Sequence, residues 1–115
     1  MQRNPCHDTA ARHSFALGVI ADDGHEYFFG TTQFIDAEFT VDAAVEESEN
    51  APPERLHLRY VTGEAVILGR GLRRLAQSLQ CGELENVRPL ARRYAGVRCT
   101  GPIISSIVVT RKEVV

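Results

Sequence analysis

The sequence predicts a single α+β domain, built as an antiparallel-dominated curved sheet or a small partly open barrel of five to seven strands with one main helix. Three observations support this fold class. The chain has 115 residues, which suits one domain and not two. Hydrophobic residues make up 43% and charged residues 24%, the usual balance of a globular protein. Short β-favouring runs alternate with turn signals, and a helical period occurs once.

Two segments lack the pattern of a packed element. Residues 1–13 are polar and follow neither a helical nor a strand period, so we expect a poorly ordered arm before one domain over 14–115. Residues 43–54 are rich in glutamate, lack large apolar side chains after Val45 and contain a pair of prolines. We expect an exposed acidic loop there.

The first paired strands are expected around an Asp-Gly turn. Two β-favouring runs, 15–20 and 27–29, lie on either side of Asp-Gly at 23–24. Such a pair supplies the positive φ angles of a two-residue hairpin turn. The sequence therefore predicts a hairpin in which Ile20 faces Tyr27.

The clearest alternation in the chain runs over residues 33–42. Apolar side chains occupy one side of the expected strand: Ile35, Ala37, Phe39 and Val41. Acidic side chains occupy the other side: Asp36, Glu38 and Asp42. This pattern predicts a half-buried strand with an acidic outer face. We take the three acidic residues as a candidate surface for a protein partner or for self-association, because complementary charge steers such encounters.

A second hairpin is expected in the middle of the chain. An alternating segment over 56–60 and an apolar run over 65–68 flank Thr-Gly at 62–63, and pairing across that turn places Leu58 beside Ile67. The run 65–68 is apolar without interruption, which predicts an interior strand covered on both faces.

The helical period follows directly. The residues that recur at helical spacing are Leu72, Leu75, Ala76 and Leu79. Gly82 suits the left-handed position after a helix, so we expect the helix over about 71–81, packed on the interior strand. A short strand over 84–87 and a closing β-branched strand over 103–110 complete the prediction. The pattern over 89–98 leaves a loop and a single helical turn both open.

Charge divides the chain into two unlike halves. From Met1 to Glu54 there are two basic and eleven acidic residues, a net charge of −9. From Arg55 to Val115 there are eleven basic and four acidic residues, a net charge of +7. Three interpretations stay open: an anion-binding face in the second half, two halves that neutralise one another within one fold, or opposed surfaces that pair between copies.

The chain carries no apolar stretch near the roughly 18 residues that a membrane span needs, and no signal-peptide core behind its N-terminus. We therefore expect no membrane partner and a cytoplasmic location. Cys6, Cys81 and Cys99 are odd in number and form no C-x-x-C pair, which indicates free thiols. Since the histidines and cysteines follow no ligand spacing, we expect no metal and no cofactor.

The strongest candidate for a ligand site is the strand-to-helix junction at residues 69–74. A helix N-terminus presents unpaired amide groups and partial positive charge. Arg70, Arg73 and Arg74 add full charges there, so the junction could bind an anion, or act as a basic surface for a protein partner or a second copy, or else be a tight turn beside a solvated helix face. The other arginines of the second half extend this hypothesis to single-stranded nucleic acid, with Tyr60 and Tyr94 as stacking platforms.

The first hairpin resembles that of cold-shock domains in the spacing of Ala16–Ile20, Asp22–Gly24 and Phe28–Gly30. That resemblance implies a shared hairpin arrangement and no more. Leu17 and Val19 occupy the positions where the family has stacking aromatics, and Gly30 replaces its histidine.

The sequence thus predicts a small non-enzymatic binding or assembly module that acts through charged surfaces. The first alternative is anion or single-stranded nucleic-acid binding through the arginine-rich second half. The second is a small enzyme, for which the nameable catalytic pair is His57 with Cys81 or Cys99.

Overall fold

The computed structural model describes residues 5–10, 14–41, 54–91 and 101–112. These residues form eight strands, one α-helix and one 3-10 turn. The strands are β1 His7–Thr9, β2 Ala16–Ile20, β3 Glu26–Gly30, β4 Phe34–Val41, β5 Glu54–Tyr60, β6 Gly63–Arg70, β7 Leu84–Val87 and β8 Ile103–Arg111. The helix α1 spans Arg73–Gln80, and the 3-10 turn Thr31–Gln33 joins β3 to β4.

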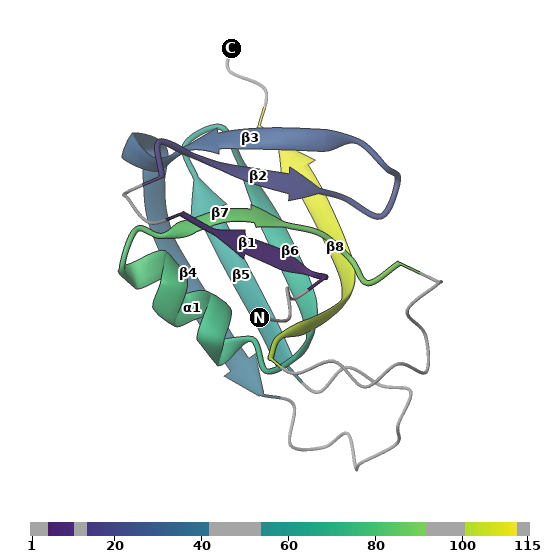
Figure 1. Cartoon of the computed structure of the whole chain (residues 1–115). Helices are drawn as coiled ribbons and strands as arrows, with labels where there is room; N and C mark the ends of the chain where they lie inside the picture. Colours follow the sequence, from purple (N-terminus) through teal and green to yellow (C-terminus); the bar gives the residue numbers. More distant parts are fainter. Residues whose placement is uncertain (1–4, 11–13, 42–53, 92–100, 113–115) are drawn as a thin grey trace.

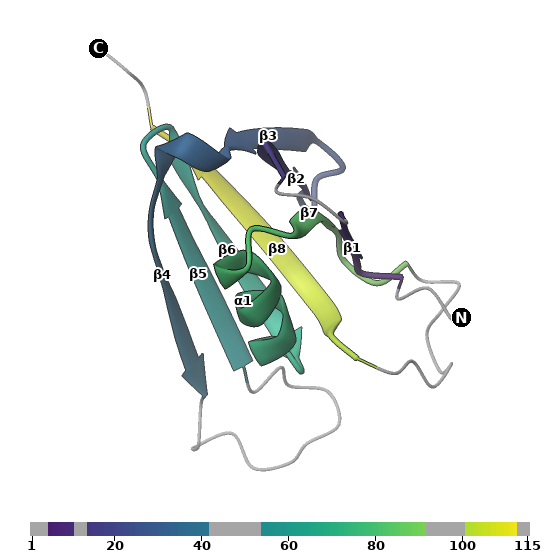
Figure 2. The same cartoon turned by 60° about the vertical axis from the view of Figure 1, so that its left-hand side comes forward.

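The strands make two four-stranded sheets, in the orders β1-β7-β2-β3 and β4-β5-β6-β8. Every neighbouring pair is antiparallel except β2 with β7, which is parallel. The first sheet and α1 lie on the same face of the second sheet (Figures 1 and 2). The expected antiparallel-dominated α+β fold with one helix is confirmed in part. The described residues form two sheets, neither closed into a barrel, and eight strands where five to seven were predicted.

The additional strand comes from the segment that the sequence predicts to be a poorly ordered arm. β1 pairs with β7, and Cys6 just before it is fully buried. The backbone N–H of Ile104 donates to the Cys6 Sγ atom at 3.3 Å, which ties the start of the chain to β8. A strand of three residues is too short to show a period, so the sequence pattern misses it.

Both expected hairpins form, with registers that differ from the prediction. In the β2–β3 hairpin Ile20 opposes Glu26 and not Tyr27, because the loop is Asp22–Gly24, with Gly24 at a φ of 85°. In the β5–β6 hairpin Leu58 opposes Ala65 and not Ile67. The second difference is a slip of two residues, which leaves each side chain on its predicted face.

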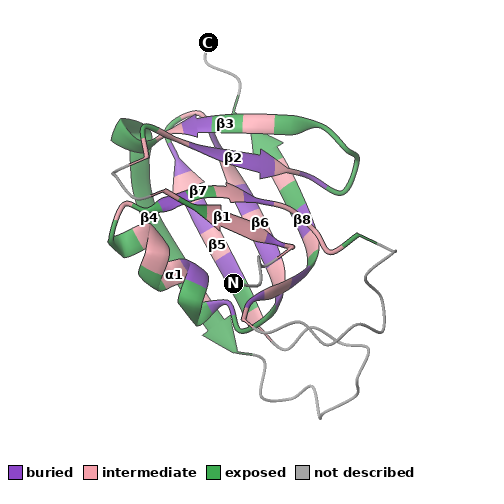
Figure 3. Cartoon of the chain, viewed as in Figure 1, coloured by how far each residue is buried: buried purple, intermediate pink, exposed green. Residues whose placement is uncertain are grey.

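The core lies between the two sheets and under α1, and Figure 3 shows its buried positions alternating along β5 and β6. The Phe29 ring from the first sheet stacks on the Tyr60 ring from the second, with centroids 4.8 Å apart. Burial raises the pKa of Tyr60 to about 12. β6 is an interior strand, as expected. However, Val66 and Leu68 are half-exposed on the far face of the second sheet, which is the face turned away from the first sheet and α1. The strand is therefore not covered on both faces.

Candidate functional site

The strand β4 lies at one edge of the second sheet. It pairs with β5 along its length, and no other described strand pairs with its opposite side, which we call the free edge of β4. A bulge between Phe34 and Asp36 displaces Ile35 from the alternation that the sequence suggested. Phe34, Ala37 and Phe39 therefore share the face that points toward α1.

Next to the free edge is a groove of about 450 Å³ between β4 and α1. Its residues are Phe34, Ala37, Phe39, Leu56, Arg73, Ala76, Gln77, Leu79 and Gln80. The strand is exposed almost throughout, with only Phe39 half-buried, and Figure 3 shows β4 in the colour of exposed residues. The expectation of a half-buried strand is therefore only partly met, because α1 leaves the apolar face of β4 mostly uncovered.

Arg73 is the one charged residue among the described residues that line the groove. The guanidinium of Arg73 lies over the Phe39 ring, 4.8 Å from its centroid. This cation–π contact holds the side chain against the groove wall. No carboxylate of the described residues forms an ion pair with Arg73.

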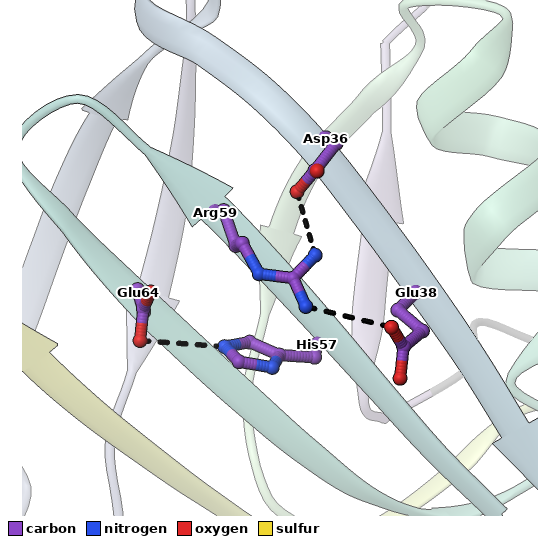
Figure 4. A network of polar contacts seen from close by, with 5 residues as sticks. All are labelled: Asp36, Glu38, His57, Arg59 and Glu64. Carbon is purple, nitrogen blue, oxygen red and sulfur yellow. Dashed lines mark hydrogen bonds and ion pairs between the residues drawn. The ribbon is translucent and has the colours of Figure 1, made fainter.

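The opposite face of β4 carries a polar network, drawn in Figure 4. Arg59 of β5 bridges two carboxylates of β4, with Nη1 2.7 Å from Asp36 Oδ1 and Nη2 3.5 Å from Glu38 Oε2. The hydrogen bond to Asp36 raises the pKa of Arg59 above its ordinary value. Beside them, His57 Nε2 lies 3.4 Å from Glu64 Oε2. The network faces away from α1, because Leu56, which precedes His57 on β5 and so points to the opposite face, lines the groove.

The structure does not bring the two predicted charged surfaces together. Asp36 and Glu38 lie with Arg59 on the far face of the second sheet (Figure 4). Arg73 and Arg74 are exposed on α1, which lies over the other face (Figure 2). Asp42 lies outside the described residues. Sequence reasoning missed Arg59 as the partner of the acidic pair, although the alternation of β5 already placed it on one side with His57.

The strand-to-helix junction is occupied by the chain itself. The carboxylate of Glu54 accepts hydrogen bonds from the backbone N–H groups of Gly71 and Leu72, both at 3.0 Å. These amides are the donors that the anion hypothesis assigned to a ligand. Arg70 ends β6 beside them and is exposed. The sequence assigned Glu54 to the acidic loop, but it is the first residue of β5.

Other sequence-based candidates are separated or buried. His57 lies on the far face of the sheet and Cys81 follows α1 on the near face, so they cannot act as a pair, while Cys99 lies outside the described residues. Tyr60 is 1% exposed and cannot serve as a stacking platform, and Tyr94 is not among the described residues. Within the described ranges no three histidine, cysteine or acidic side chains gather as metal ligands.

Comparison with known proteins adds no identification, because no protein-family model, curated protein or solved structure matches the chain. In the described part of the chain, no helix has the length and apolar character required to cross a lipid bilayer.

Proposed function

We propose that this protein is a small protein-binding module that accepts an extended segment of a partner protein along the free edge of β4. The carrying observation is the combination of an eight-residue edge strand with an apolar groove beside it. An edge strand offers backbone N–H and C=O groups to an incoming strand, and pockets beside the edge select its side chains. This proposal specifies the binding module that the sequence predicts.

The groove supports binding of side chains from alternate positions of the incoming strand. Successive side chains of a strand point to opposite faces of a sheet, so every second residue of an added strand would enter the space between β4 and α1. Phe34 at 37% exposure and the exposed Ala37 offer apolar surface there that nothing else described covers. Burying such surface favours association by roughly 25 cal/mol for each Å² removed from water.

The alternatives raised by the sequence have less support. Glu54 already satisfies the amides that an anion would use, and Tyr60 belongs to the core. For an enzyme, no nucleophile of the described residues is hydrogen-bonded to His57 Nε2, and the charged group near that atom is the Glu64 carboxylate.

A peptide selection tests the proposal. Random twelve-residue peptides displayed on phage are selected on the full chain, and the enriched peptides are titrated against two variants. Ala37→Trp places an indole in the groove and should weaken binding more than tenfold. Thr110→Trp puts the same ring on an exposed position of β8, at the other edge of the same sheet, and should leave affinity within about twofold.

Amide hydrogen exchange then locates the bound peptide. Strand addition should slow exchange of amides in β4 and leave those of β3, one of the two edge strands of the other sheet, unchanged. Enriched peptides that bind Ala37→Trp as well as the unsubstituted chain, or that protect another element, would count against this function.

A further inference from the structure

We propose that the segment accepted by β4 alternates basic and apolar residues, with lysine or arginine on the face that carries Asp36 and Glu38 and apolar side chains toward the groove. This inference rests on the proposed function and specifies the chemistry of its partner. It follows from the different character of the two faces of β4.

The far face supplies excess negative charge at the edge itself. Asp36 and Glu38 are both on the outermost strand, and their side chains are 56% and 60% exposed. They share a single guanidinium, that of Arg59, which lies on the inner neighbour β5. An added strand therefore meets two carboxylates that share one guanidinium, reaching them from the side of β5, so the three groups together keep one net negative charge. Directly opposed side chains of neighbouring strands lie about 5 Å apart, close enough for ion pairs.

Arg59 also orients these carboxylates. Its two terminal nitrogens hold one carboxylate each, so both side chains are drawn along the far face and not around the edge toward α1. Oxygens that are not engaged with Arg59 remain available to a lysine or arginine of the partner. Arginine is the better match, because its planar fork can contact a carboxylate through two N–H groups.

The groove face disfavours the same cations. Its lining is largely apolar, and Arg73 already places a guanidinium over Phe39. A lysine directed there would lose hydration and approach a like charge. Basic residues are thus confined to one face of the added strand, which also fixes its register to steps of two residues.

The charges argue against a second copy of β4 as the occupant. In an antiparallel pair of two β4 strands, the carboxylates of both copies would crowd the same face, and like charges opposite one another destabilise a sheet. The bulge at Ile35 further disfavours continuous pairing at that end. A partner of opposite charge removes the repulsion.

Three synthetic peptides test this inference. Each has seven residues, with capped termini and valine at positions two, four and six; the other four positions are all lysine, all glutamate or all serine. Each is titrated into the ¹⁵N-labelled full chain in 20 mM salt, and chemical shifts of β4 amides give location and affinity. The lysine peptide should bind at β4 at least tenfold more tightly than the glutamate peptide, with the serine peptide between them. The preference should shrink in 500 mM salt.

Charge variants separate this effect from net charge. The double change Asp36→Asn and Glu38→Gln should remove the preference for lysine. The matched change Glu83→Gln and Glu85→Gln deletes two exposed carboxylates elsewhere and should preserve it. Exposed ion pairs contribute little to folding, so both double variants should remain folded, as a thermal melt can verify.

The outcomes distinguish the two proposals. If the lysine and serine peptides bind alike at β4, or if the acidic pair can be neutralised without effect, the inferred partner chemistry is wrong while strand addition stands. If the lysine peptide does not shift β4 resonances at millimolar concentration, the inference is also overturned, and the phage selection, which presupposes no charge, still judges strand addition itself.

Discussion

Glu54 shows how one side chain from a distant segment can complete a local structure. The helix α1 has Leu72 as its N-cap residue, and no side chain at that position makes a capping hydrogen bond. Instead, the Glu54 carboxylate accepts hydrogen bonds from the backbone N–H groups of Gly71 and Leu72. Its negative charge lies at the positive end of the helix dipole. The same contact joins the start of β5 to the start of α1. A search for local capping residues cannot find it.

Folding makes the imidazole of His7 harder to protonate, because it lowers the pKa of this side chain. Burial lowers its pKa below the ordinary 6.5, and the positive charges of Arg88 and Arg74 act in the same direction, against the neighbouring Asp8. Its Nδ1 atom is buried and accepts no hydrogen bond from the described residues. Protonation is therefore less favourable in the folded chain than in the unfolded chain.

This shift predicts how stability depends on pH. Between the lowered pKa and 6.5 the unfolded chain binds a proton that the folded chain does not, so His7 contributes to stability above pH 6.5 and the contribution falls as pH decreases. Urea unfolding of the parent protein and of His7→Gln from pH 7.5 to 5 should show a steeper loss in the parent. The difference in slope is bounded by about 1.4 kcal/mol per pH unit, since one proton is involved. Parallel curves would contradict the assignment.

At the scale of elements, α1 is the part that the sequence predicts best. Its boundaries, Arg73–Gln80, fall within the expected range of 71–81, and Gly82 takes a φ of 72°. The N–H groups of Gly82 and Glu83 donate to the carbonyls of Leu79 and Ser78, which is a Schellman motif. The helical period and the C-terminal glycine are local signals, so they can be recognised in the sequence without knowledge of the rest of the fold.

The registers of the strands are harder to predict from the sequence, because contacts with distant segments determine them. The Asp22 carboxylate accepts hydrogen bonds from the Ser106 hydroxyl, 84 residues later, and from the Ile107 N–H. Because these bonds hold Asp22 against β8, Asp22 belongs to the loop and does not extend β2. The β2–β3 register therefore differs by one residue from the prediction. The groove was missed for the same reason, since its walls come from β4, β5 and α1.

The packing of α1 gives a direct test at the element scale. Leu75 is fully buried on the inward face of the helix, whereas the adjacent Arg74 is exposed. Leu75→Asp should unfold the protein, because an unpaired carboxylate in the core costs more than the whole stability of a small domain can offset. The milder Leu75→Ala should cost about 2–5 kcal/mol in urea unfolding. Arg74→Ala should leave the melting temperature nearly unchanged; a harmless Leu75→Asp would mean that the helix faces the other way.

At the scale of the whole molecule, ion pairs within one chain compensate part of the unequal charge of its two halves. Asp8 pairs with Arg88, and Asp36 and Glu38 pair with Arg59. In each case an acidic residue of the first half meets an arginine of the second. Among the described residues the structure thus favours internal neutralisation, one of the three interpretations that the sequence left open. Composition revealed the asymmetry but could not assign partners, because assignment requires the sheet order.

The pair of Asp8 and Arg88 offers the sharpest measure of this internal neutralisation. Arg88 Nη1 lies 2.8 Å from Asp8 Oδ2, a second N–H is directed at Oδ1, and both side chains are about two-thirds shielded from solvent. Bidentate geometry and partial burial should make this ion pair stronger than a typical surface ion pair. It also joins β1 to the end of β7, two segments far apart in sequence.

A double-mutant cycle with Asp8→Asn, Arg88→Gln and the combined variant should therefore give a coupling free energy of about 1 kcal/mol in urea unfolding at low salt. The coupling should decline at 0.5 M salt, since screening weakens partly exposed charges. The same cycle on Asp36 and Arg59, where the carboxylate is 56% exposed, should give a smaller value. If both cycles gave zero, these two ion pairs would contribute nothing to folding. The acidic pair Asp36 and Glu38 would then be better explained by the partner proposed above than by a contribution to the stability of the fold.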